Sequence, residues 1–276
     1  MRKISILLFI LLTTFGCKKD ESSSTFRKLK NCNIEYLFFR DDIQFSDFQS
    51  LSFPPGDSIL VCSYNNDFDH LVKITGGFFP VPQGTNLTGY LFSDYAYDSL
   101  AVKDNIFSLF SKFIDGDGIT HEYSTNPIDY FLDSQNKLLK INIRNVFYPN
   151  GFELNYKYSE NLITEEIYDS LIKRKFYFEN KNLVKVIAER YNPPGVLFWK
   201  KEIIFQDFDD NSNPFKNMYF VKGAFFRAFS EHNYQSYTVN EYGQLADSTF
   251  GIYKTYKVSM PLFYNADGYP KFGDYK

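Results

Sequence analysis

Residues 138–146 read LLKINIRNV, and from Lys140 to Arg144 the polar and apolar side chains alternate. This period of two places Ile141 and Ile143 on one face of a strand and the polar side chains on the other. One apolar face and one polar face are typical of an antiparallel sheet that is packed on one side and solvated on the other. The segment therefore predicts a strand of such a sheet.

Strand signals of the same kind continue on both sides of this segment. Aromatic and β-branched runs are separated by Asn, Asp, Gly and Pro, the residues that favour turns. We expect strands at Cys32–Arg40, Ser58–Tyr64, Phe152–Tyr158, Arg174–Phe178, Leu183–Tyr191, Leu197–Phe205 and Tyr253–Met260. We expect turns at Asn150-Gly151, Asn180-Lys181-Asn182, Pro193-Pro194-Gly195 and Asp267-Gly268. Helix signals are scarce: Asn213–Met218 predicts a single turn, and Asn105–Ile114 fits a short helix as well as a strand.

One hairpin pattern recurs at irregular spacing. An aromatic residue ends a strand, Asn, Asp or Gly forms the turn, and an aliphatic residue begins the next strand. Asn, Asp and Gly suit this position because they tolerate the left-handed backbone of a tight turn. The flanking residues can pack as a cross-strand pair that stabilises by about 0.2–1 kcal/mol. The copies are residues 64–74, 130–141, 177–186, 237–245 and 263–270, and Tyr-Asp-Ser-Leu recurs at 97–100 and 168–171.

These hairpins, with the aspartate-rich turn FDDNSNPF at residues 208–215, carry a family resemblance. Residues 58–276 resemble the uncharacterised Bacteroidetes lipoproteins with tyrosine–aspartate-like repeats. The resemblance implies a β protein of the cell envelope, and it implies no activity and no functional residue.

The pattern as a whole predicts an all-β fold. We expect an antiparallel meander of degenerate hairpins that forms an open, curved or wrapped sheet with very little helix. The expected organisation is a signal peptide at residues 1–16, a lipidated cysteine and flexible tether at 17–31, and one β-rich domain at 32–276. Two sub-sheets at 32–125 and 126–276 are the alternative.

The N-terminus has the sequence pattern of a secretory signal peptide. Arg2 and Lys3 precede an apolar run that is too short to span a bilayer, which takes roughly 20 apolar residues. Residues 14–17 (TFGC) resemble a bacterial lipobox, although Thr14 stands where leucine is usual. We therefore expect cleavage before Cys17 and acylation of that cysteine, and an ordinary signal peptide is the alternative. Each buried acyl CH₂ would contribute ~0.8 kcal/mol to membrane attachment.

The segment after the cysteine is polar and Ser-rich (KKDESSST, residues 18–25), as in a flexible tether. Lys19, Asp20 and Glu21 resemble the lysine-plus-two-acids export signal of Bacteroidetes surface lipoproteins. This resemblance implies an outer-membrane protein that faces the cell exterior. A charged linker without an export role is the alternative.

The net charge and the aromatic content of the chain indicate which kinds of partner to expect. Cleavage would remove Arg2 and Lys3 from the 30 basic residues and leave 28 against 33 acidic residues, a net charge of about −5. The charges are spread along the chain, so we expect no nucleic-acid partner. Aromatic residues form 20% of the chain. That fraction fits a sugar-stacking surface, but strand packing and an AT-rich genome are the preferred explanations.

Cys32 and Cys62 remain once Cys17 is lipidated. In an oxidising compartment an even number of cysteines favours a disulfide. The bridge would close a loop of about 30 residues and stabilise the fold by roughly 3–4 kcal/mol. Two separate buried thiols are the alternative.

No catalytic motif is readable. The chain lacks a Gly-x-Ser-x-Gly elbow, a P-loop and a dinucleotide-binding glycine motif, so we expect no enzyme. The three histidines stand apart from other metal-ligating residues: His70, His121 and His232. The 33 acidic residues still leave room for the paired carboxylates of a glycoside hydrolase.

Two kinds of modification or ligand site are suggested by short motifs. Asp115, Asp117 and Glu122 lie in DGDGITHE (residues 115–122) and offer hard oxygen ligands for Ca²⁺. A plain surface turn is the alternative, because the full loop pattern is absent. Four serines match the three-residue O-glycosylation signal of Bacteroidetes envelope proteins, with turn chemistry before a strand as the alternative: Ser58, Ser99, Ser170 and Ser248.

Together these features favour a lipid-anchored binding or structural module on the outer membrane, with a glycan, a peptide or an envelope protein as partner. A periplasm-facing carrier or assembly factor for lipid or protein is the second hypothesis, and it would need an apolar cavity inside the curved sheet. A hydrolase is the third, and it would need a cleft with two carboxylates of different pKa.

Overall fold

The computed structural model describes residues 28–37, 50–52, 58–65, 70–83, 87–122, 127–144, 151–167 and 171–275. Within these ranges the protein is almost entirely strand, and two 3-10 turns, η1 (Ile34–Tyr36) and η2 (Arg227–Phe229), are its helical segments. The strands are β1 (Asn31–Asn33), β2 (Ser50–Ser52), β3 (Ile59–Tyr64), β4 (Leu71–Gln83), β5 (Leu87–Lys103), β6 (Ile106–Ile114), β7 (Thr120–Glu122), β8 (Ile128–Leu132), β9 (Leu138–Ile143), β10 (Phe152–Ser159), β11 (Leu162–Ile167), β12 (Ile172–Glu179), β13 (Asn182–Asn192), β14 (Val196–Phe208), β15 (Tyr234–Gln244) and β16 (Phe250–Ser259).

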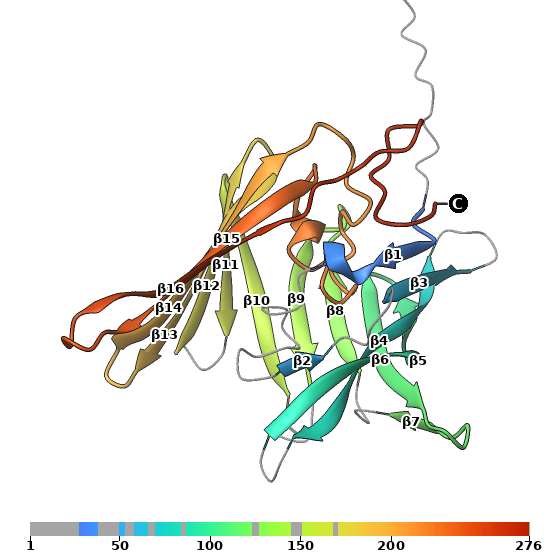
Figure 1. The fold of residues 1–276 in the computed structure, drawn as a ribbon, viewed down its shortest axis with the longest axis horizontal. Coiled ribbons are helices and arrows are strands. Elements are labelled where there is room, and N and C mark those ends of the chain that lie inside the picture. Colours follow the sequence, from blue (N-terminus) through green and yellow to red (C-terminus); the bar gives the residue numbers. More distant parts are fainter. Residues whose placement is uncertain are drawn as a thin grey trace, which may run out of the picture.

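All sixteen strands belong to one sheet, with the order β1-β3-β4-β5-β6-β8 and then consecutively to β16. Short β2 and β7 pair with β5 and β6 beside this path, and β2 is the one parallel pairing among the described strands. The sheet is curved and open, with β1 and β16 at its two edges (Figure 1). The predicted antiparallel meander with very little helix is therefore confirmed.

Local sequence explains individual elements. Alternation in β9 buries Ile141 and Ile143, as the period of two requires, and a bulge at Leu139 opposite β8 brings Leu138 onto the same buried face. The turn between β12 and β13 places Asn180 and Lys181 at φ of 48° and 64°, the left-handed region that a two-residue hairpin turn needs. The segment that fits a helix as well as a strand, residues 105–114, forms strand β6.

Two local predictions are wrong. The strand expected at Cys32–Arg40 stops at Asn33, because the Asn33 side chain accepts a hydrogen bond from Glu35 N and turns the chain into η1. In the hairpin copy at residues 237–245, residues 237–244 are a continuous part of β15 and form no turn. The turn follows it, where Leu245 N donates to Thr249 O.

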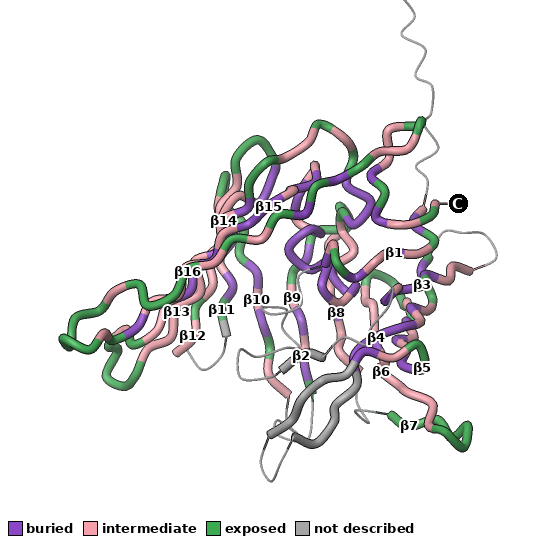
Figure 2. Tube along the Cα trace, in the orientation of Figure 1, coloured by how far each residue is buried: buried purple, intermediate pink, exposed green. Residues whose placement is uncertain are grey.

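The inner face of the sheet is filled by the chain itself. Residues 209–233, which connect β14 to β15 and are called the plug here, lie against the sheet (Figure 1) and are largely buried (Figure 2). The expected turn at Asn213–Met218 begins the plug: the Asn213 side-chain amide donates to Arg227 O and Ser230 O, and its oxygen accepts from Phe215 N. The buried apolar plug residues are Phe215, Tyr219, Phe220, Val221, Ala224, Phe225, Phe226 and Ala228.

A buried ion pair holds the plug to the sheet on the β5–β6 side. Lys222 Nζ donates to Asp98 Oδ1 at 2.6 Å and to Ser111 Oγ at 2.8 Å, and Ser111 Oγ donates to the same carboxylate at 2.6 Å. Phe220 stacks on Phe107 beside this cluster, with ring centroids 4.9 Å apart. We call Asp98, Ser111 and Lys222 the clamp.

Arg227 joins the plug to both ends of the described chain. Its guanidinium is fully buried, donates to Tyr36 O and Tyr234 O, and lies over the rings of Tyr234 and Phe272. No carboxylate is bonded to it in the described residues, and its Nη2 has no hydrogen-bond partner there.

The two ends of the described chain meet. Lys30 N donates to Asp274 O, and Leu29 bridges to Tyr275. A Cβ on Gly273 would overlap the Asn31 carbonyl, so only glycine fits this contact. This junction lies at one end of the molecule, and the hairpin ends of β13–β14 and β15–β16 lie at the other (Figure 1).

Candidate functional site

The site is built on the inner face of β10–β16, the face that packs on the plug. Near the plug this face is apolar: Phe176 contacts Phe225 and Phe226, and Phe205 contacts Phe226. The next row of side chains on this face, away from the plug, has seven members. Each member is the direct register partner of the next. They are Tyr156, Glu165, Arg174, Ala188, Lys201, Glu241 and Lys254.

The first part of this row is a buried ionic group. Arg174 donates from Nε and Nη2 to the two oxygens of Glu165, at 2.6 and 2.5 Å, and Tyr156 OH donates to Glu165 Oε2 at 2.7 Å. Burial and the Glu165 charge raise the pKa of Tyr156 well above its usual value. The Arg174 guanidinium also lies 5.8 Å from the Phe176 ring centroid and 5.9 Å from that of Phe225, so the group packs against the plug.

The second part of the row supports two aromatic rings. Glu241 lies 3.8 Å from Lys201 Nζ and 3.9 Å from Lys254 Nζ, and its Oε2 accepts a hydrogen bond from Tyr253 OH at 3.0 Å. Lys201 Nζ is 5.5 Å from the ring centroid of Trp199, and Arg190 Cζ is 5.0 Å from it. Arg190 and Trp199 are direct partners between β13 and β14.

Two β-bulges shape this part of the sheet. Between β15 and β16 the register shifts after Glu241, so Tyr253 is an extra residue on β16. A bulge changes the direction in which the neighbouring side chains point. Here, as a result, both Tyr253 and its neighbour Lys254 contact Glu241. Between β13 and β14 the register shifts after Arg190, which makes Phe198 the extra residue.

The Tyr253 ring lies close to the backbone of Gly243. A Cβ on Gly243 would be 3.2 Å from Tyr253 Cε1, which is tighter than most such contacts. Burial raises the pKa of Tyr253, the hydrogen bond to Glu241 raises it further, and the nearby Trp199 side chain lowers it. These contacts fix the orientation of the ring before any ligand arrives.

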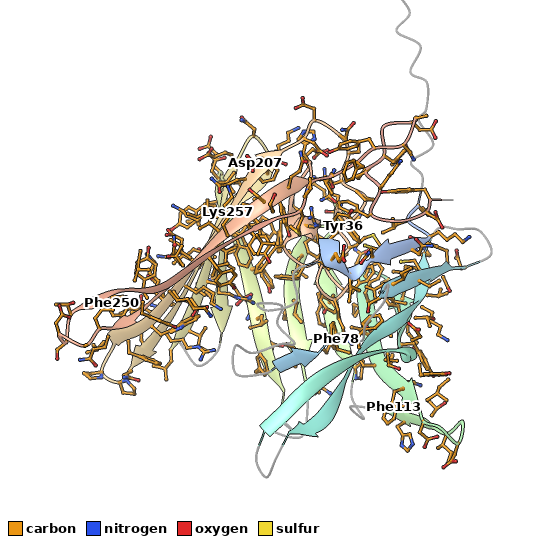
Figure 3. The ribbon with its side chains drawn as sticks, in the orientation of Figure 1. Tyr36, Phe78, Phe113, Asp207, Phe250 and Lys257 are labelled. Carbon is orange, nitrogen blue, oxygen red and sulfur yellow. The ribbon has the colours of Figure 1, made fainter. Side chains whose placement is uncertain are left out.

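We call Arg190, Trp199, Tyr253 and Lys254 the distal strip. Tyr253 is 51% exposed and the Lys254 side chain 52%, whereas Lys201 beneath them is 2% exposed. The strip residues precede or follow the β13–β14 and β15–β16 turns by a few positions. These hairpin ends are exposed (Figure 2), and Phe250 lies among them (Figure 3). Five of the twelve exposed large hydrophobic residues of the described chain lie on β14 and β16: Val196, Phe198, Phe250, Ile252 and Tyr253. The strip can stack a flat apolar surface and bind a polar or anionic group beside it.

The residues predicted for lipidation and export, Cys17 and Lys19-Asp20-Glu21, lie outside the described residues. So does Ser170 among the glycosylation candidates. Ser58 is 6% exposed, and Ser99 is half-buried with its hydroxyl directed at Phe110 O. Ser248 is exposed in the β15–β16 turn, and is the accessible candidate of the three described serines.

Cys32 and Cys62 are free, buried thiols in the structure. They lie on neighbouring strands, but Cys32 is the partner of Leu60, so the two cysteines are diagonal neighbours. Diagonal Cα atoms in an antiparallel pair are roughly 7–8 Å apart, which is longer than a disulfide usually spans. The predicted bridge is therefore not formed in this arrangement. Burial raises the pKa of both thiols, that of Cys62 to about 12.

The predicted calcium ligands are not brought together. Asp115 Oδ1 accepts hydrogen bonds from the backbone of Asp117 and Ile119, and its Oδ2 bonds to His121 Nε2. Glu122 pairs instead with Lys112 at 2.9 Å. Across the described ranges, no three Asp, Glu, His or Cys side chains are grouped as metal ligands. These contacts fit the alternative that the sequence left open, a surface turn.

The distal strip was missed by the sequence analysis. Three signals point to it in retrospect: Trp199 is the single tryptophan of the chain, Gly243 interrupts a strand, and Tyr253-Lys254 lies in a predicted strand. None of them shows that β13, β14 and β16 meet at one level, because that depends on the register and on the two bulges.

Comparisons with known proteins add little. Neither a scan against protein families nor a search of curated proteins finds a match. A search of solved structures finds a porin-like protein from Bacteroides uniformis ATCC 8492, with a TM-score of 0.38 and 9% sequence identity over 74% of this chain and 89% of that chain. A match at this level carries no argument about function, so the family resemblance of the hairpins stays a prediction. No helix in the described part of the chain is long and apolar enough to cross a membrane.

Proposed function

We propose that this chain is a lipid-anchored protein of the bacterial outer membrane that binds a glycan on the cell exterior through the distal strip. The observation that carries the binding role is a pre-oriented pair of rings on the inner face of the sheet, the exposed Tyr253 and the half-buried Trp199. Large, rigid rings beside a few polar groups are typical of ligand sites, and sugars present flat C–H faces to such rings.

The arrangement of the chain suits an anchored binding module. The tether would enter the domain at Lys28, beside the C-terminal Tyr275, whereas the strip lies toward the opposite end (Figure 1). The lipid anchor and the outward orientation rest on Cys17 and on Lys19-Asp20-Glu21. The alternative of a lipid carrier gains no support, since the plug occupies the inner face where a cargo would be held.

Glycan binding is tested with the purified full-length protein in detergent, by retardation in gels that contain bacterial and plant polysaccharides. We expect retardation by at least one glycan, and its loss in Trp199→Ala. Phe198→Ala is the matched control, because Phe198 is an exposed aromatic residue at the bulge of the same strand. Retardation that survives Trp199→Ala, or no retardation of the folded protein, would contradict the proposal.

The location is tested by protease treatment of intact cells, with antibody detection of the mature chain. We expect digestion while a periplasmic control protein survives. Replacement of Lys19, Asp20 and Glu21 by alanine should make the chain resistant. A wild-type chain that resists until the outer membrane is broken would show that it faces the periplasm.

A further inference from the structure

We infer that the fold encloses a binding site for one small monovalent anion, such as chloride, between Nη2 of Arg227 and the hydroxyl group of Tyr234. The site is separate from the distal strip, and the inference does not depend on glycan binding. Its basis is a buried positive charge that has no carboxylate partner in the described part of the chain. The neighbouring hydroxyl group also lacks a hydrogen-bond partner there.

The Arg227 guanidinium is satisfied on two sides only. The residue is 0% exposed, Nε donates to Tyr36 O at 2.9 Å, and Nη1 donates to Tyr234 O at 3.1 Å. Nη2 has no acceptor among the residues that the structure describes. Arginine keeps its proton in proteins, so this buried group stays charged. A buried charge without a counter-charge is costly, and neutral carbonyl groups offset that cost only in part.

Aromatic rings surround the guanidinium. Its Cζ lies 3.8 Å from the ring centroid of Tyr234 and 4.9 Å from that of Phe272. The faces of these rings attract a cation but supply no net negative charge. Tyr234 is 1% exposed, and its hydroxyl group is without a partner in the described ranges. Because the guanidinium lies over this ring, one small ligand beside the ring can accept hydrogen bonds from both groups.

The titratable neighbours of Arg227 do not supply the missing negative charge. The Arg227 charge lowers the pKa of Cys32, Tyr234 and Tyr264. Burial is the larger effect in each of the three, and it raises the pKa above the usual value. All three side chains are therefore neutral at neutral pH, and none of them compensates the guanidinium.

Asp209 is connected to this region through Tyr264, but its carboxylate is occupied by other donors. Oδ2 accepts hydrogen bonds from Tyr264 OH at 2.6 Å and from Asn233 Nδ2 at 3.0 Å. Oδ1 accepts from the backbone N–H groups of Asn211 and Asn233. Asp209 forms no ion pair with Arg227, whose hydrogen bonds go to two carbonyl groups.

The size and chemistry of the site select a small anion. Arg227, Tyr234 and Phe272 are each at most 1% exposed, so a ligand among them is enclosed when the chain folds. Such a site admits a ligand of about the size of a water molecule or a halide ion. Water would satisfy the two donors and leave the charge unpaired, whereas chloride satisfies both needs. We therefore treat a bound water molecule as an outcome of the test.

A bound anion would strengthen the junction between the plug and both ends of the described chain. Arg227 belongs to the plug, Tyr36 lies in η1 near the start of the described chain, and Phe272 lies near its end. Neutralising the guanidinium would remove the cost of its burial at the point where these three segments meet.

The first test is equilibrium unfolding of the mature chain in urea, with chloride replacing gluconate at constant ionic strength. An anion that binds only the folded state lowers the unfolding equilibrium constant in proportion to its concentration, once that exceeds Kd. We expect a tenfold increase in chloride to lower this constant by about threefold to tenfold. Bromide should act like chloride, because it is also a small monovalent ion. An unfolding constant that does not respond to chloride would overturn the inference.

Variants locate the effect. Tyr234→Phe keeps the ring and removes one donor, so the response to chloride should weaken several-fold. Arg227→Met should abolish it. The matched control is Tyr219→Phe, because Tyr219 is a buried tyrosine of the plug whose hydroxyl donates to Asn217 instead. A full response in Tyr234→Phe would place the ion elsewhere and overturn the inference, even if Arg227→Met does not fold.

The second test is a crystal of the mature protein grown in bromide, which is identified by its anomalous scattering. We expect one bromide within hydrogen-bond distance of Arg227 Nη2 and Tyr234 OH. Density without an anomalous signal at this position would show water alone and would refute the anion.

Discussion

Replacing Lys222 by methionine should release the plug from the β5–β6 side of the sheet. Lys222 Nζ lies 2.6 Å from Asp98 Oδ1, and the two side chains are 10% and 5% exposed. At an effective dielectric constant of about 20, unit charges at this distance attract by about 6 kcal/mol. Desolvation costs several kcal/mol per ion, so the net contribution of the pair is small.

Removing one partner is different, because it leaves a buried charge unpaired. We expect Lys222→Met and Asp98→Val each to lower the free energy of unfolding by about 3–5 kcal/mol. In the double variant no charge is left, and Ser111 loses two hydrogen-bond partners at a cost of about 1–3 kcal/mol. The double variant should therefore be more stable than either single variant.

Equilibrium unfolding of the mature chain in urea, followed by tryptophan fluorescence, measures all four proteins of this cycle. Additive effects, within about 0.5 kcal/mol, would show that the clamp is not an isolated buried pair and would refute the reasoning. A matched control is Lys157→Met, because Lys157 pairs with Glu166 at 2.6 Å but both side chains are at least half exposed. That change should cost less than about 1 kcal/mol.

The remaining predictions concern the core, the ends and the thiols. Phe176→Ala should lower the free energy of unfolding by about 3–5 kcal/mol, against about 0.5 kcal/mol or less for the exposed Phe198→Ala; equal effects would argue against the packed plug. Gly273→Ala should cost about 1–3 kcal/mol, because its Cβ overlaps the β1 backbone, and proteolysis near the N-terminus should become faster; an unchanged rate would contradict this. The native protein should not react with a thiol reagent at pH 8, because both cysteines are buried. The urea-unfolded chain should show two reactive thiols, Cys32 and Cys62, without reductant. If the two cysteines formed a disulfide, the unfolded chain would show no reactive thiol. Burial raises the pKa of Cys62 in the folded protein from 9 to about 12. The buried thiol therefore stabilises the fold fully below pH 9, and this contribution declines by up to about 1.4 kcal/mol per pH unit as the pH rises toward 12. In a Cys62→Ala variant the free energy of unfolding should decline less steeply over this range, and an unchanged slope would contradict the shift.

Short-range rules predicted the strands and several of their turns. The alternation at Lys140–Arg144 and the turn at Asn180-Lys181 depend on neighbours in sequence, and both are found where expected. The same rules were wrong at Ile34–Tyr36, where one side-chain hydrogen bond redirects the chain. They also placed a hairpin within residues 237–245, where pairing with β14 and β16 keeps strand β15 continuous to Gln244.

The plug shows the limit of sequence patterns most clearly. Residues 215–229 read FKNMYFVKGAFFRAF and have neither the period of a strand nor that of a helix. Their role depends on a surface that exists only when β8–β14 have paired, since Phe225 packs on Tyr156 and Phe176 from different strands. Lys222 and Asp98 are 124 residues apart, and nothing local connects them.

By itself, the sequence determined the class of fold and the character of each strand, because side-chain alternation and turn chemistry act between residues a few positions apart. It also carries the leader and the cysteine on which the predicted anchor rests. The tertiary structure decided which strands are neighbours, which face the plug covers and where the side chains of Trp199 and Tyr253 meet. The physical reason is register: a row of side chains across seven strands depends on every pairing and on two bulges between them, and such long-range choices leave no period in the chain.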